Sequence, residues 1–121
     1  MKLHEHRQSR MNLISSYGDG EILINGQRLT APCIIAPGFL HQDWIGSLSD
    51  LTLASIEPVW ALQPRILLLG AAQSPAAAAR ALRPPLAAKQ LALEAMELGA
   101  ACRTYNVLAQ EDRSVAALLF P

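Results

Sequence analysis

The stretch PRILLLG, residues 64–70, decides the fold of this 121-residue chain. Its apolar run is bounded by proline and glycine, which is typical of a central strand buried on both faces of a sheet. Before it, Ser55 can cap a short helix to about Leu62, with Pro58 tolerated in the first turn. The order helix then strand predicts a layered α/β domain.

The residues before this helix predict an antiparallel meander. Asn25-Gly26 is a strong hairpin signal, and Pro32 implies an edge position or a bulge in the third strand. Residues 39–50 are predicted to form a loop with some extended structure around Trp44. The predicted strands cover residues 11–17, 21–25 and 28–36.

After the central strand, local patterns are less decisive. Residues 76–83 suit a plain helix or a low-complexity loop, and Pro84-Pro85 suits the start of a helix with residues 86–90 as its body. Residues 91–98 have high helix propensity but also alternate like a strand. A helix over residues 100–110 and a last strand over residues 115–120 complete the pattern.

Composition favours one globular domain over residues 11–121, after a flexible segment at residues 1–10. Hydrophobic residues make up 51% of the chain and charged residues 17%. Ten basic residues balance ten acidic ones, so the chain lacks the excess positive charge of a nucleic-acid binder. The zero net charge also gives little repulsion between copies of the chain, which allows a homo-oligomer.

Other sequence patterns indicate the cellular compartment of the protein and whether it binds a cofactor or a metal. Cys33 and Cys102 lie far apart and form no CxxC, which predicts free thiols in a reducing compartment. The apolar runs are too short to cross a membrane, so we expect a soluble, cytoplasmic protein without membrane insertion. The loop after Gly70 lacks nucleotide-binding motifs, and His4-Glu5-His6 lacks HExxH spacing. We therefore expect no cofactor and no metal.

The run ACRTYNVL, residues 101–108, holds most of the candidate site residues. Cys102 would lie in the first helical turn, where the helix dipole favours a thiolate. A nucleophile needs a base, and His41 is the only histidine outside the first ten residues. Free cysteines are among the most buried residues, so we predict a core position for Cys102 and no catalytic residue.

Arg103 and Asn106 share the polar face of this helix, and two interpretations stay open. They could bind an anion beside the Gly70 loop, where ligands of layered α/β domains lie. Alternatively, Arg103 pairs with Glu94 or Glu97, and Asn106 holds the backbone of a neighbouring loop. Trp44, on a loop, is the candidate anchor for a protein partner.

Three segments together resemble one known family: the apolar strand that Gly70 closes, the run Met96 to Leu108, and the terminal run Glu111 to Leu119. It is a family of small α/β proteins of unknown biochemical activity that includes a mitochondrial assembly factor of respiratory complex I. The resemblance implies a three-layer domain with a mixed central sheet, an added antiparallel N-terminal β-layer and no established catalytic residue. It also favours a strand over residues 91–98. The chain departs from the family pattern at Gly70-Ala71-Ala72 and Glu97-Leu98, where a hydroxyl is missing.

These observations support two functions. The first is a non-enzymatic interaction or assembly factor that presents Arg103, Asn106 and Trp44 to a protein of a membrane or respiratory complex. The alternative is a small-molecule or anion-binding protein, or an unrecognised enzyme. It would use a cleft between the Gly70 loop and the helix start at Gly99, with Cys102 or Arg103 at the ligand.

Overall fold

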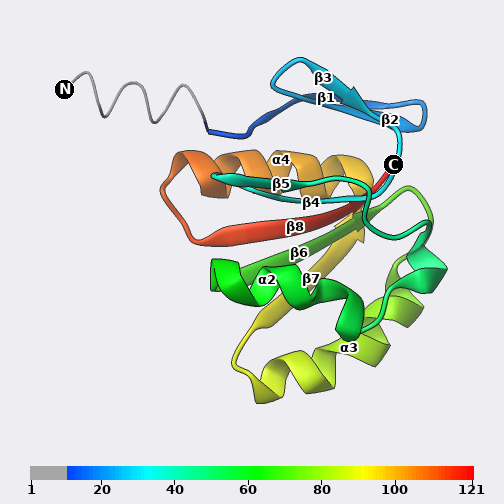
Figure 1. Cartoon of the computed structure of the whole chain (residues 1–121), viewed down its shortest axis with the longest axis vertical. Coiled ribbons are helices and arrows are strands. Elements are labelled where there is room, and N and C mark those ends of the chain that lie inside the picture. Colours follow the sequence, from blue (N-terminus) through cyan, green and yellow to red (C-terminus); the bar gives the residue numbers. More distant parts are fainter. Residues whose placement is uncertain (1–10) are drawn as a thin grey trace.

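The structure, a computed structural model, describes residues 11–121 (Figure 1). The flexible segment expected at residues 1–10, including His4-Glu5-His6, lies outside these residues. In chain order the elements are β1 (Ile14–Gly18), β2 (Glu21–Ile24), β3 (Gln27–Leu29), β4 (Cys33–Ala36), β5 (Phe39–His41), the 3-10 turns Leu48–Asp50 and Ala54–Ile56, α2 (Glu57–Leu62), β6 (Ile66–Ala71), α3 (Ala76–Ala88), β7 (Ala92–Glu97), α4 (Leu98–Gln110) and β8 (Val115–Phe120).

The strands form a three-stranded antiparallel sheet, β1-β2-β3, and a five-stranded mixed sheet in the order β5-β4-β8-β6-β7. In the larger sheet β6 is parallel to β7 and β8, whereas β4 is antiparallel to β5 and β8. The α/β class, the mixed central sheet and the added antiparallel N-terminal layer are thus confirmed.

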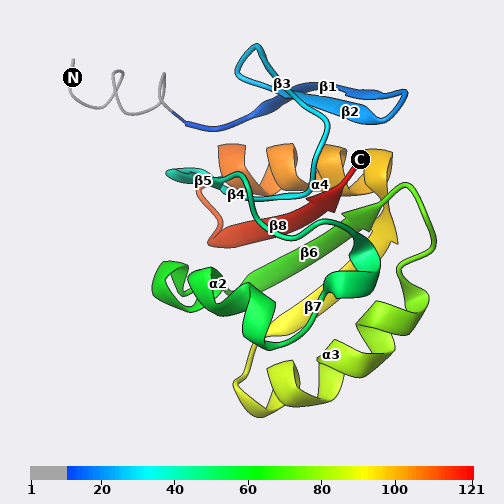
Figure 2. The same ribbon diagram turned by 45° about the vertical axis from the view of Figure 1, so that its right-hand side comes forward.

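The layers explain why the central strand is apolar along its whole length. α4 lies between the two sheets, and α2 and α3 lie on the opposite side of the five-stranded sheet (Figures 1 and 2). Alternate residues of β6 therefore enter two separate cores: Leu68 packs on the α4 side, and Leu67 and Leu69 pack on the α3 side. A strand covered on both faces has no polar side, as the apolar run predicted.

The meander is confirmed in part. Asn25 and Gly26 have φ angles of 51° and 84°, the left-handed values that a tight two-residue hairpin turn needs, and they join β2 to β3. The single third strand over residues 28–36 is wrong. The chain leaves the small sheet after Leu29 and enters the large sheet as β4. Pro32 lies between the two strands, where its missing N–H group interrupts the ladder of hydrogen bonds.

Two helix boundaries also differ from expectation. Pro84 and Pro85 do not begin a helix but lie inside the continuous helix α3. They remove two backbone donors, but Leu82 and Leu86 are buried against the sheet on either side of them, and this packing holds the helix together. In α2, Ile56 takes the N-cap position, and the Ser55 hydroxyl instead donates to the Thr52 carbonyl oxygen at 2.7 Å.

The strand over residues 91–98 is confirmed as β7, despite its helical composition. Every residue of β7 pairs in parallel register with β6, from Ile66 opposite Ala92 to Ala71 opposite Glu97. Leu91 and Leu93 are buried in the core under α3. Pairing and burial outweigh propensity here because propensity differences amount to only about 0.7 kcal/mol per residue.

Candidate functional site

The start of α4 is fixed by Glu97, the last residue of β7. Its Oε1 accepts a hydrogen bond from the Ala100 amide at 3.1 Å, so the helix begins at Leu98, two residues earlier than expected. The amides of Gly99 and Ala100 lower the pKa of Glu97. The carboxylate is therefore an N-cap that satisfies the first helical amides.

Cys102 is buried, with 1% of its surface exposed. Burial and then the charge of Glu97 raise the pKa of its thiol to about 11, although Arg103 acts in the opposite direction. Cys33 lies in the same core, where burial raises the pKa of its thiol to about 12. His41, the only candidate base, lies on β5 and stacks on Phe39. The predicted core position of Cys102 is confirmed, and burial favours the protonated form of its thiol.

Asn106 joins α4 to the N-terminal sheet. Its Oδ1 accepts from the Ile14 amide at 2.9 Å, and its Nδ2 donates to the Ile14 carbonyl oxygen at 2.7 Å. On the same helix the hydroxyl of Tyr105, which is fully buried, donates to the Asn12 carbonyl oxygen at 2.7 Å. The two bonds of Asn106 carry out the structural role that was one of its two interpretations, and the Tyr105 bond adds to the same attachment.

Arg103 lies on the exposed side of the same helix and contacts Tyr17 of β1. Its Nη1 donates to the Tyr17 hydroxyl, and its guanidinium carbon lies 5.8 Å from the centre of the tyrosine ring. Among residues 11–121 it forms no ion pair, so the pairing expected with Glu94 or Glu97 is wrong. The Tyr17 ring also covers the helix start, where a Cβ on Gly99 would lie 2.6 Å from Cε1 of the ring.

Gly70 is a packing position. A Cβ at this residue would lie 2.3 Å from the Cβ of Ala101, so only glycine lets α4 approach β6 this closely. The cleft expected between the Gly70 loop and Gly99 is therefore filled by Ala101 and Leu98 on one side and by the Tyr17 ring on the other. This expectation is corrected: the space lies on the other face of the sheet.

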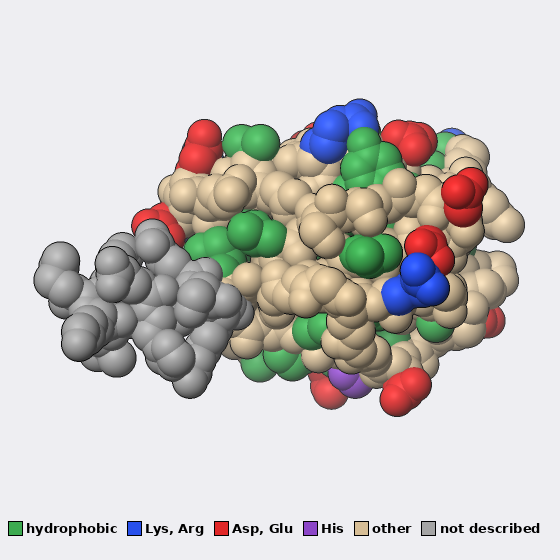
Figure 3. Space-filling view, turned by 90° about the horizontal axis from the view of Figure 1, so that it is seen from above, with side chains coloured by type: hydrophobic (Ala, Val, Ile, Leu, Met, Phe, Trp, Pro, Cys, Tyr) green, Lys and Arg blue, Asp and Glu red, His purple; other side chains and the backbone are tan. Residues whose placement is uncertain are grey.

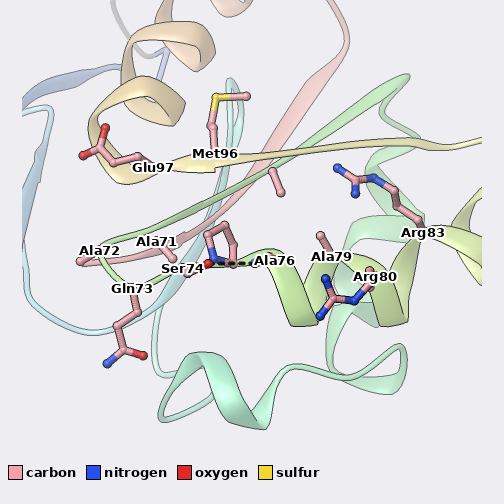
Figure 4. A pocket seen from close by; sticks show the side chains of 12 residues that line it. Ala71, Ala72, Gln73, Ser74, Ala76, Ala79, Arg80, Arg83, Met96 and Glu97 are labelled. Carbon is pink, nitrogen blue, oxygen red and sulfur yellow. Dashed lines mark hydrogen bonds between the residues drawn. The ribbon is translucent and has the colours of Figure 1, made fainter.

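There, a hollow of about 420 Å³ lies beside α3, at the carboxyl ends of β6 and β7 (Figure 4). None of the five residues expected at a site lines it. Its charged side chains are Arg80 and Arg83 of α3 and Glu97 at the end of β7. Sequence reasoning missed the two arginines, although they are the only charged residues of the helix and stand three apart. It failed because residues 76–90 were divided at the prolines.

Trp44 is half-buried in the loop after β5. Its Nε1 donates to the Ser55 carbonyl oxygen at 2.7 Å, and its ring packs against Phe120 at a centroid distance of 5.5 Å. The side chain thus anchors the loop on the core, and only part of the ring is left for a partner. Among the residues described, no three histidine, cysteine, aspartate or glutamate side chains are grouped as a metal site would require. No helix of this region is long and apolar enough to span a membrane.

Comparison with known proteins identifies the family. A family model described as a protein of unknown function, DUF498/DUF598, matches residues 14–120. The chain belongs to this family. The match includes both sheets and all the helices, so the family resemblance seen in the sequence is confirmed.

Relatives of the DUF498/DUF598 chain include the human NADH dehydrogenase [ubiquinone] 1 alpha subcomplex assembly factor 3. The two are 28% identical over 123 residues, which cover 100% of this chain and 67% of the human protein. The rat assembly factor is 31% identical over 89% of this chain and 60% of its own length. The chain thus spans about two thirds or less of the length of these relatives.

Solved structures share the fold. A Bordetella parapertussis protein superposes with a TM-score of 0.80 at 32% identity, covering 92% of this chain and 96% of that one. A Bordetella pertussis protein described as a Mth938-like domain superposes with a TM-score of 0.71 at 29% identity, covering 91% of this chain and 85% of that one. The fold of this chain is therefore shared with these solved structures.

Proposed function

We propose that this chain is a non-enzymatic interaction factor that helps assemble a multi-subunit complex, with respiratory complex I as the first candidate. The observation that carries the proposal is the similarity to NADH dehydrogenase assembly factors over 89% to 100% of the chain. The chemistry of α4 is consistent with it, because burial raises the pKa of the Cys102 thiol and Asn106 is hydrogen-bonded to the backbone of Ile14.

The exposed side of α4 is the surface that we assign to the partner. Val107 is 53% exposed and Tyr17 is 41% exposed, and they are the large hydrophobic side chains most open to solvent among residues 11–121. A shallow, mostly apolar hollow along this side is lined by Arg103, Thr104, Val107 and Leu108. An apolar patch with an arginine and an aromatic ring at its border has the composition of interface hot spots.

The outer face of the N-terminal sheet is a weaker candidate. On the face of the molecule seen from above, hydrophobic side chains form separate patches among backbone and other side chains in the coloured part of the surface (Figure 3). The exposed Arg28 and the half-buried Glu21 of this sheet pair with each other at 3.1 Å. A surface divided in this way offers little continuous apolar area to a partner.

The test compares complex I in cells that lack the chain with cells that express it again. We expect deletion to lower the amount of fully assembled complex I on native gels, and wild-type chain to restore it. Val107→Arg should fail to restore assembly, because it places a charged side chain at the centre of the apolar patch. Ala87→Arg, at an exposed position near the end of α3, is the matched control and should restore it.

The same two variants also need a stability measurement. Both substitutions are at exposed helical positions, so each should change the free energy of unfolding by no more than about 0.5 kcal/mol. Normal complex I in the deleted cells would refute a role in its assembly. Full restoration by Val107→Arg would refute the assignment of the surface.

A further inference from the structure

The hollow beside α3 lies where the chain topology opens the sheet. β6 and β7 are parallel neighbours, so their carboxyl ends meet at the same edge. The chain leaves β6 into α3 on one face of the sheet, and leaves β7 into α4 on the other face (Figure 2). The two connections therefore diverge and leave a crevice between the strand ends, which is the place where open α/β sheets bind ligands.

Small side chains create the space. The walls that face one another come from the end of β6, from one side of α3 and from β7, and their apolar residues are mostly alanines. Because an alanine side chain is a single methyl group, the wall is apolar without filling the crevice. The alanines that line it are Ala71, Ala72, Ala76, Ala79 and Ala95.

Two arginine side chains line this space. Arg80 and Arg83 stand one turn apart on α3; in Figure 4 the Arg83 side chain lies between the helix and the strand, and the Arg80 side chain lies over the helix. Nε of Arg83 donates to the Leu93 carbonyl oxygen at 3.3 Å, which holds its side chain against β7. The rest of the guanidinium group remains available for other acceptors.

These two charges have no protein counterion in residues 11–121. The ion pair of this part of the chain, Arg28 with Glu21, involves neither of them, and α3 has no acidic residue. Glu97 lines the opposite rim but accepts the Ala100 amide at the start of α4. Like charges one turn apart destabilise a helix, and no acidic side chain of α3 offsets them.

We propose that the crevice binds a small phosphate-bearing molecule, with its phosphate held between Arg80 and Arg83 and its organic part against the alanines. Arginine forms paired, charge-assisted hydrogen bonds with phosphate oxygens, and two guanidinium groups match the charge of a phosphate monoester. A hollow of about 420 Å³ is within the size range of small-molecule sites. This ligand site is separate from the partner surface on α4 and does not depend on it.

The test is a titration of isotope-labelled protein, followed by amide chemical shifts at constant ionic strength. The probes are inorganic phosphate, ribose 5-phosphate and acetate. We expect the two phosphates to shift the amides of residues 72–79 and 94–97 saturably, with ribose 5-phosphate binding more tightly and acetate causing no comparable shift. Arg80→Ala and Arg83→Ala should each weaken phosphate binding about tenfold.

Arg113→Ala is the matched control, because Arg113 is an exposed arginine at the other end of the sheet, just before β8. It should leave both titrations unchanged, and unfolding curves of all three variants should resemble that of the wild type. The proposal is refuted if neither phosphate produces saturable shifts in the crevice. It is also refuted if acetate binds equally well, or if the Arg80 and Arg83 variants bind as the wild type does.

Discussion

Replacing Gly70 by alanine tests the closest contact between α4 and the central strand. The added Cβ would lie 2.3 Å from the Cβ of Ala101 and 3.2 Å from Cδ2 of Leu119. Carbon atoms in ordinary contact are about 3.5–4.0 Å apart, so the helix and the strand would have to separate by more than about 1 Å. Neither Cβ can rotate away, because each is bonded directly to backbone.

We expect Gly70→Ala to lower the free energy of unfolding by about 3 kcal/mol, at the upper end of the cost of overpacking a core. A loss of this size is a large part of the stability of a small domain, which is about 5–15 kcal/mol. Urea denaturation followed by circular dichroism measures it. Gly38→Ala is the matched control, since nothing lies within 4 Å of its Cβ, and it should change stability by no more than about 0.5 kcal/mol.

A second substitution locates the cause. Ala101→Gly alone should cost about 1 kcal/mol, because glycine is unfavourable inside a helix. In the Gly70→Ala background it should instead restore stability, since it removes the atom that the new methyl group meets. We expect a favourable coupling free energy of about 1–3 kcal/mol in the double-mutant cycle. A Gly70→Ala protein as stable as the wild type, or strictly additive costs, would refute this account of Gly70.

Three further predictions concern α4 and the core behind it. Asn106→Ala removes the side chain that binds the amide and carbonyl groups of Ile14, so the free energy of unfolding should fall by about 2–3 kcal/mol and the Ile14 amide should exchange faster with solvent. The control is Gln110→Ala, an exposed position one turn further along α4, and an equal effect of both substitutions would contradict the role assigned to Asn106. The Cys102 thiol should react with a thiol reagent only after unfolding, and fast reaction in native buffer would contradict its burial. Burial raises the pKa values of Cys33 and Cys102 above the 9.0 of an exposed thiol, so the folded state keeps protons that the unfolded state releases. The contribution of the two thiols to the free energy of unfolding should be constant below about pH 9 and then fall by up to about 1.4 kcal/mol per pH unit for each thiol, and Cys33→Ala should flatten this fall.

Local pattern was a reliable guide wherever one rule acted alone. The apolar run of residues 64–70 had no competing interpretation and became β6, and the Asn25-Gly26 turn formed as its φ preferences require. Prediction from local pattern failed where packing against distant segments determines the local structure. Pro32 separates two strands of different sheets, and Pro84-Pro85 lie within a helix, because the packing of neighbouring residues decides both outcomes.

The candidate site shows the same division. The helix that contains Cys102, Arg103 and Asn106 could be predicted from sequence, and so could the burial of the thiol. The partners of Arg103 and Asn106 could not, because Tyr17 and Ile14 lie more than eighty residues away in the chain. The crevice beside Arg80 could not be predicted either, since it depends on which face of the sheet each helix takes.

A layered α/β domain around one apolar strand could be predicted from the amino-acid sequence, because hydrophobic periodicity and turn residues act over a few neighbours. The contacts by which Gly70 and Asn106 hold α4 in place, and the open space beside Arg80 and Arg83, became visible in the folded chain. The physical reason is that close approach, burial and unpaired charge are properties of segments that meet across the fold, and no short stretch of sequence contains both partners.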